Sequence, residues 1–179
     1  LYRDASSLLA KSNLISFLEE FGQVYFTGSF HHGLMTVPDI DLYLTSPRAG
    51  REQAKEILNR LIDQGFWNAY FFGDWVNFRV PDLPEGYYIG LKHTFGNKRW
   101  KVDIWILPSV PEEQAQFDRM LENSLTDAYR LLILEIKHWR DTKQLDISSK
   151  LIYEAVLAGK VKSIKSFQNY AGISIPCTE

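Results

Sequence analysis

Apolar residues recur at helical spacing in two segments of the first half of the chain. Between residues 14 and 21 they follow the spacing i, i+3, i+4, i+7, which predicts a helix that Gly22 ends. Between residues 54 and 61 the same spacing predicts a second helix, which ends near Gly65. Each helix has one apolar face, so each is expected to pack against another element.

Short apolar runs predict strands around these helices. Residues 24–26 predict a buried strand that ends at Gly28-Ser29, and residues 39–44 alternate between two unlike faces. Because this alternation has a period of two, residues 39–44 predict a strand with an aliphatic side and an acidic side.

Two hairpins are expected in the middle of the chain. The first joins residues 67–72 to residues 75–80 through a turn at Gly73-Asp74. The second joins residues 87–95 to residues 100–107 across Gly96-Asn97-Lys98-Arg99.

The last third of the chain has a helical pattern. Ser109 and Glu112 have the spacing of a capping box and predict the start of a helical region. One or two helices are expected up to Trp139, and shorter helices near residues 147–157 and 161–170. Strands followed by helices predict an α/β (α+β) chain with a C-terminal helical segment.

Composition narrows the class of protein. The chain has 179 residues, a mass of 20.8 kDa and 45% hydrophobic residues, which fits one globular domain or a core with a helical annex. A net charge of −2 excludes a strongly basic nucleic-acid-binding protein, although basic residues outnumber acidic ones from Lys137 onward.

The cysteine content and the hydropathy of the chain bear on the cellular compartment in which it is expected. A single cysteine, Cys177, excludes an intramolecular disulfide and a cysteine zinc cluster, and it favours a reducing compartment such as the cytoplasm. No stretch approaches the length of about 18 apolar residues needed to span a membrane, and the first residues lack the pattern of a signal peptide.

Two acids stand out in the alternating strand. Asp39 and Asp41 share one face of it, while Ile40 and Leu42 point into the core. Two carboxylates this close repel each other, and a divalent cation removes the repulsion. Mg²⁺ prefers one or two carboxylates together with phosphate oxygens, so the pair predicts a metal–phosphate site.

A third acid lies in a later strand of similar character. Asp103 is the single acid in an aliphatic and aromatic run, and it shares a face with Lys101 and Trp105. An isolated carboxylate there is costly unless it is solvated, paired or bound to metal. If this strand lies beside the first acidic strand, three carboxylates converge and could hold two metal ions about 4 Å apart.

Gly28-Ser29 is the candidate phosphate-binding turn. Glycine lets the backbone approach a ligand closely, and the Ser29 hydroxyl adds a hydrogen-bond donor. The turn could open a short helix over residues 30–34 whose N–H groups face a phosphate. The alternative is a plain turn next to solvated acids.

This pattern of apolar-Gly-Ser, Asp-apolar-Asp about ten residues later and a distant strand Asp resembles the nucleotidyltransferase superfamily typified by DNA polymerase β. The compact form is similar to the small antibiotic-modifying and toxin-type members. The resemblance implies a mixed, twisted sheet flanked by helices. Residues 1–108 would form the catalytic core, and residues 109–179 a helical region packed on it.

The resemblance also implies roles for the motif residues. Gly28 and Ser29 would bind the β and γ phosphates of a nucleoside triphosphate, and Asp39 and Asp41 would ligate two Mg²⁺ ions. Asp103 would complete the catalytic metal site and help to deprotonate the acceptor hydroxyl. The implied reaction is in-line attack of an acceptor on the α-phosphate, with release of pyrophosphate.

Several other residues have two possible roles. Lys150, which follows two serines at a predicted helix start, is the preferred cation to reach the triphosphate, with Lys137 and Arg140 as further candidates. His31-His32 could approach the triphosphate or belong to a surface loop. Four aromatic residues could stack on a base, but core packing is expected for most of them: Trp75, Tyr87, Tyr88 and Trp105.

The acceptor remains open at this point. A small molecule or a protein is favoured over RNA, because the net charge is weak and no RNA-binding module is recognisable. The alternative to an enzyme is a catalytically inactive nucleotide-binding or partner-binding relative, and either could belong to a toxin–antitoxin pair.

Overall fold

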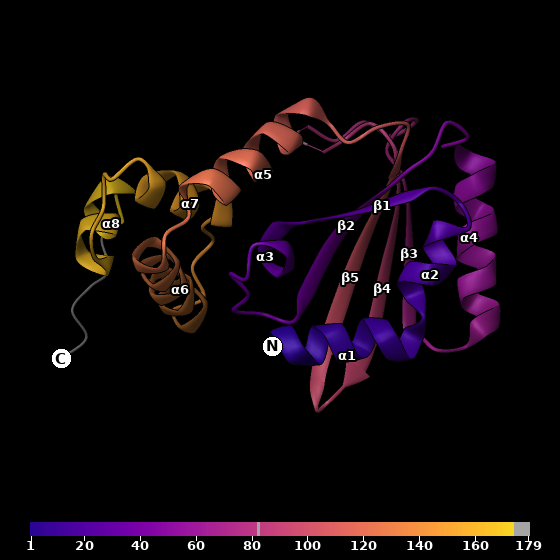
Figure 1. Ribbon diagram of the computed structural model, residues 1–179, viewed down its shortest axis with the longest axis horizontal. Helices are drawn as coiled ribbons and strands as arrows, with labels where there is room; N and C mark the ends of the chain where they lie inside the picture. The colour runs from indigo at the N-terminus through magenta and orange to yellow at the C-terminus, as the bar shows by residue number, and fades with distance from the viewer. Residues whose placement is uncertain (82, 174–179) are drawn as a thin grey trace. The chain divides into compact units, whose positions relative to one another are not determined.

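The computed structural model describes residues 1–81 and 83–173 (Figure 1). The described residues fall into two compact units, one up to Asp118 and one from Arg119 onward. The first unit contains the whole β-sheet, and the described part of the second unit is helical. Cys177 lies outside the described residues.

The first unit is built on one five-stranded sheet (Figure 1). In spatial order, its strands are β1 (Gln23–Thr27), β2 (Asp39–Thr45), β5 (Lys98–Leu107), β4 (Tyr87–Phe95) and β3 (Ala69–Asp74). Strands β2 and β5 run parallel, and the other neighbouring pairs are antiparallel. The sheet is therefore mixed, and the predicted α+β fold class is confirmed.

One face of the sheet carries the hydrophobic core. Three helices pack there: α1 (Tyr2–Ser12), α2 (Leu14–Glu19) and α4 (Arg51–Gln64). Strand residues on this face are fully buried: Ile40, Leu42, Leu44, Ile89, Leu91, Val102 and Ile104. Since side chains alternate along a strand, the acids between these aliphatic residues point to the opposite face.

The second predicted hairpin is confirmed. Strands β4 and β5 pair around Gly96 and Asn97, whose φ angles of 57° and 60° lie in the left-handed region. Two central residues with positive φ are typical of the type I′ turn, whose twist matches that of the flanking strands. Strand β5 begins at Lys98, so the connection is tighter than the sequence suggested.

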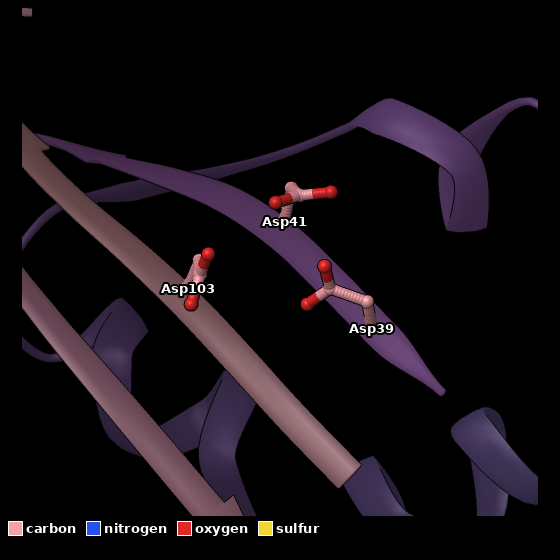
Figure 2. A group of neighbouring side chains, drawn as sticks. All are labelled: Asp39, Asp41 and Asp103. Carbon is pink, nitrogen blue, oxygen red and sulfur yellow. The ribbon is translucent and has the colours of Figure 1, made fainter. Parts of the chain in front are cut away.

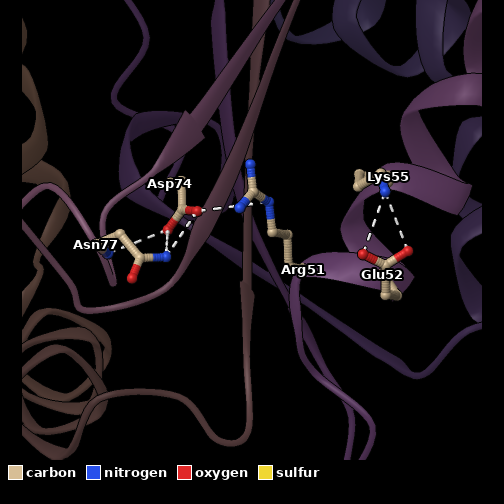
Figure 3. A network of polar contacts seen from close by, with 5 residues as sticks. All are labelled: Arg51, Glu52, Lys55, Asp74 and Asn77. Atoms are coloured by element: carbon tan, nitrogen blue, oxygen red, sulfur yellow. Dashed lines mark hydrogen bonds and ion pairs between the residues drawn. The ribbon is translucent and has the colours of Figure 1, made fainter.

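The first predicted hairpin is wrong. Strand β3 pairs with β4, and residues 75–80 form no strand. The reason lies at the end of β3, where the Asp74 carboxylate accepts hydrogen bonds from the backbone N–H and side-chain amide of Asn77, at 3.1 and 3.0 Å (Figure 3). These bonds turn the chain out of the sheet, and Arg51 lies 3.8 Å from the same carboxylate.

Up to residue 173, where the described part of the chain ends, four helices follow the sheet. They are α5 (Glu112–Ser124), α6 (Asp127–Thr142), α7 (Ser149–Leu157) and α8 (Ile164–Tyr170). The helical pattern up to Trp139 thus forms two helices, and the two shorter helices are confirmed.

Local capping explains most of these boundaries. The Thr126 side chain caps α6 and the Ser148 side chain caps α7 through bonds to backbone N–H groups. The proposed capping box of Ser109 is wrong, because α5 begins only at Glu112. None of the helices in the described part of the chain has the length and apolar character needed to cross a bilayer.

Candidate active site

Three carboxylates meet on the sheet face that lies away from α1, α2 and α4. The parallel pairing of β2 and β5 places Asp41 directly beside Asp103, and Asp39 precedes them on the same face (Figure 2). One carboxylate oxygen from each residue lies within 4.8 Å of the others. Hard oxygen ligands at this spacing can share a divalent cation such as Mg²⁺.

Lys101 lies among these acids. Its Nζ is 2.6 Å from Asp103 Oδ2 and 3.8 Å from Asp39 Oδ2. Burial alone would lower the pKa of Lys101, but the hydrogen bond with Asp103 and the nearby negative charges outweigh it and raise that pKa. A protonated Lys101 therefore offsets part of the carboxylate repulsion.

Tyr88 holds the other oxygen of Asp103. Its hydroxyl donates a hydrogen bond of 2.6 Å to Asp103 Oδ1. Burial raises the pKa of Tyr88, and the bonded carboxylate raises it further, so the hydroxyl stays protonated as a donor. The sequence indicated Tyr88 only as a stacking residue, because no local pattern identifies its partner on the next strand.

Replacing Tyr88 by phenylalanine is expected to weaken the binding of a divalent cation such as Mg²⁺ at the three carboxylates about tenfold, because residues that orient a ligand typically contribute this much. The measurement is the dissociation constant of Mg²⁺ from a titration of the chain with the metal alone. Tyr87→Phe is the matched control, since Tyr87 neighbours Tyr88 on β4 and points to the other face. An unchanged dissociation constant in Tyr88→Phe would show that Asp103 is positioned without this bond.

Gly28 brings the backbone close to the carboxylates. Its φ is +66°, and a Cβ atom there would lie 2.4 Å from Asp41 Oδ2. The short helix expected over residues 30–34 begins earlier, as α3 (Gly28–His31). Within the described residues the Ser29 hydroxyl makes no hydrogen bond, so it is available to a ligand beside Asp41.

A buried polar network fixes both ends of α3. Asp118 on α5 accepts a hydrogen bond of 2.9 Å from Thr27 Oγ1, and its second oxygen lies 2.8 Å from His32 Nε2. Gln114 bonds to both Thr27 and Asp118. Burial would raise the pKa of Asp118, but the hydrogen bonds from His32, Thr27 and Gln114 hold it below its usual value. His32 is thus part of this network, whereas His31 is exposed.

Replacing Asp118 by alanine is expected to destabilise the chain by about 1–3 kcal/mol, because partners of the carboxylate lose a buried bond. Since the pKa of folded Asp118 is lowered, its contribution is complete above about pH 4 and is lost as the pH falls through the folded-state pKa. The measurement is the free energy of unfolding against pH, compared with Asp63→Ala on the exposed side of α4. A difference between the two variants that persists in strong acid would contradict this role.

The remaining predicted cations belong to the second unit. Lys150 is exposed in the first turn of α7. Lys137 is only 2% exposed, and its Nζ donates a hydrogen bond of 3.0 Å to the Tyr153 hydroxyl. The role of Lys150 stays a prediction.

Comparison with known proteins places the fold. No family model matches the sequence. The Cid1 poly(U) polymerase with Mg and 3′-dATP bound is similar with a TM-score of 0.61 and 18% identity, covering 87% of this chain and 47% of that one. The polymerase core of TRAMP, an RNA surveillance complex, is similar with a TM-score of 0.57 and 15% identity. The match covers 84% of this chain and 49% of that one.

The GLD-2/RNP-8 complex is also similar, with a TM-score of 0.51 and 18% identity over 83% of this chain and 48% of that chain. The chain therefore spans about half the length of each of these structures. It has the fold of the DNA polymerase β-like nucleotidyltransferases, the superfamily that its motifs resemble.

Proposed function

We propose that this chain is a metal-dependent nucleotidyltransferase. It would move a nucleoside monophosphate from a nucleoside triphosphate to an acceptor hydroxyl and release pyrophosphate. The observation that supports this most strongly is the convergence of Asp39, Asp41 and Asp103 beside the Gly28 turn, in a nucleotidyltransferase fold.

Each residue has a distinct task in this reaction. Asp39 and Asp41 would hold two Mg²⁺ ions, and Gly28 and Ser29 would bind the β and γ phosphates. Bound Mg²⁺ would supply electrostatic stabilisation of the charge that develops on the phosphate oxygens. Asp103 would help to hold the catalytic metal and to take up the proton of the acceptor hydroxyl, while Tyr88 and Lys101 keep its two oxygens in position.

The acceptor in this proposal is the 3′-hydroxyl of an RNA. The weak net charge and the lack of a recognisable RNA-binding module favoured a small molecule or a protein, but two of the similar structures are named for a poly(U) polymerase and for an RNA surveillance complex. Net charge describes the whole chain, and a local basic surface is compatible with a value of −2.

The test is incubation with Mg²⁺, an RNA primer and each of the four ribonucleoside triphosphates in turn. Primer extension with matching pyrophosphate release is expected for at least one nucleotide, and chelation of the metal should stop both. Asp41→Asn should be inactive and Asp63→Asn should retain activity, since Asp63 is exposed on α4. Pyrophosphate release that persists in Asp41→Asn would remove the assignment.

A catalytically inactive relative is the alternative. Nucleotide binding that needs no metal, without turnover on any acceptor, would favour it. The complete set of three carboxylates supports the enzyme instead, because a chain released from catalysis has no need to keep three acids on one sheet face.

A further inference from the structure

The geometry of the proposed reaction limits where the acceptor can lie. The Gly28 turn contacts Asp41 on β2, whereas Asp103 lies on the neighbouring strand β5, which continues the sheet toward β4 and β3. Attacking and leaving oxygens are roughly in line across a transferred phosphoryl group. With the pyrophosphate at Gly28, the acceptor would therefore approach over β5, β4 and β3; this step rests on the proposed function.

That side of the sheet carries a continuous series of aromatic rings, here called the aromatic strip: Phe71, Trp75, Phe78, Tyr88 and Trp105. Adjacent ring centroids lie 5.2 Å (Tyr88–Trp105), 5.7 Å (Tyr88–Phe71), 6.4 Å (Phe71–Trp75) and 6.2 Å (Trp75–Phe78) apart. Tyr88, which belongs to the strip, donates a hydrogen bond from its hydroxyl to Asp103. At the other end, Phe71 is 52% exposed and Phe78 is 69% exposed.

Glycines beneath the strip allow two of its rings to lie on the sheet backbone. A Cβ atom at Gly73 would lie 2.7 Å from the Trp75 indole, and one at Gly90 would lie 2.7 Å from the Tyr88 hydroxyl. The turn that carries Trp75 and Phe78 is held by the bonds between Asp74 and Asn77 (Figure 3). The backbone of the turn that carries Trp75 and Phe78 is thus held by its own hydrogen bonds.

A basic pocket lies near the start of β5, on the N-terminal side of Asp103, whereas Trp105 of the aromatic strip lies on its C-terminal side. It has a volume of about 250 Å³, and its charged lining residues are Lys92, Arg99 and Lys101. Lys92 and Lys101 are directly opposite in the β4–β5 pairing, where like charges are unfavourable, and Lys101 is already paired with Asp103. Within the part of the chain that the structure describes, Lys92 and Arg99 form no ion pair.

We propose that the aromatic strip and the basic pocket together are the acceptor site, and that the acceptor is single-stranded RNA. Unpaired bases near its 3′ end stack on Phe71 and Phe78, and its backbone phosphates are held by Lys92 and Arg99. Exposed aromatic rings and a group of cations on one face of a sheet are the combination that single-stranded nucleic acids require. An apolar peptide would use the rings but leave the cations without a partner.

The experiment measures binding without turnover. A fluorescent single-stranded oligoribonucleotide is titrated with the chain in the presence of a chelator, and its anisotropy gives the dissociation constant. Phe71→Ala and Phe78→Ala are each expected to weaken binding roughly tenfold, the usual loss per stacked base. Ile62→Ala should leave it unchanged, because Ile62 is 47% exposed but lies on α4, which packs on the opposite sheet face.

The cations are tested by salt dependence. In plots of log binding constant against log salt, the double variant Lys92→Ala, Arg99→Ala should have a slope about 1.4 units shallower than the unaltered chain, since each phosphate contact on a single strand contributes about 0.7. Lys55→Ala on α4 is the control, because Lys55 is paired with Glu52 on the same helix (Figure 3).

Three outcomes would overturn the inference: no RNA binding by the unaltered chain, an RNA affinity of the Phe71→Ala and Phe78→Ala variants equal to that of the unaltered chain, or an unchanged salt slope in the double variant. The proposed function fails separately, if no nucleoside triphosphate is consumed with any acceptor. If the variants lose RNA binding but the chain shows no turnover, the RNA-binding surface is supported and the enzymatic function is rejected. If the chain turns over a small hydroxyl compound but binds no RNA, the enzymatic function is supported and the RNA-binding surface is rejected.

Discussion

Replacement of Asp103 by asparagine is expected to slow nucleotidyl transfer about a thousandfold, while binding of the Mg²⁺–nucleotide complex changes by less than about threefold. The asparagine oxygen can still accept the hydrogen bond from Tyr88, whereas the ion pair with Lys101 is lost, so the change removes the charge with almost no change in side-chain volume. Asp39 and Asp41 remain on β2 to hold the metal and nucleotide. The loss should therefore fall on the chemical step and not on ground-state binding.

The measurement is a single-turnover rate at saturating nucleotide, together with a separate titration of nucleotide binding. Asp41→Asn is the informative comparison, because it should lose both binding and transfer. Asp63→Asn changes the net charge by the same amount on exposed α4 and should lose neither. Equal losses of binding and rate in Asp103→Asn would mean that Asp103 serves the nucleotide and not the acceptor.

The acidic face could be predicted from the sequence because strand alternation is local. Asp39 and Asp41 share a face for the same reason that Ile40 and Leu42 are buried, and each fact follows from neighbouring residues alone. The position of Asp103 beside these two acids could not be predicted from a local pattern. It depends on the parallel pairing of β2 with β5, which the strand patterns do not specify and which only the family resemblance implied.

The residues that support the site could not be predicted in this way. Tyr88 bonds Asp103 across 15 positions of sequence, and Asp118 bonds Thr27 across 91. Single contacts between distant elements leave no periodic pattern in the chain. The incorrect first hairpin has a related cause: residues 75–80 are rich in apolar side chains, but a side-chain bond from Asp74 ends the strand before them.

Replacement of Gly28 by alanine is expected to lower the transfer rate about a hundredfold and to destabilise the chain by about 1–2 kcal/mol. Two separate effects contribute. The positive φ of +66° is unfavourable for alanine, and the new Cβ would lie 2.4 Å from Asp41 Oδ2. The carboxylate must move or the turn must open, and either change displaces the proposed phosphate-binding backbone from the metal ligands.

Gly65→Ala separates the two effects. Gly65 ends α4 with the same φ of +66°, but no atom lies within 4 Å of the position of its Cβ. It should therefore show the loss of stability, measured by chemical denaturation, without a loss of transfer rate. If both variants lost stability equally and Gly28→Ala kept its full rate, the close approach of the Gly28 backbone to Asp41 would have no part in catalysis. A selective loss of rate in Gly28→Ala, restored in part by higher nucleotide concentration, would place this turn at the triphosphate.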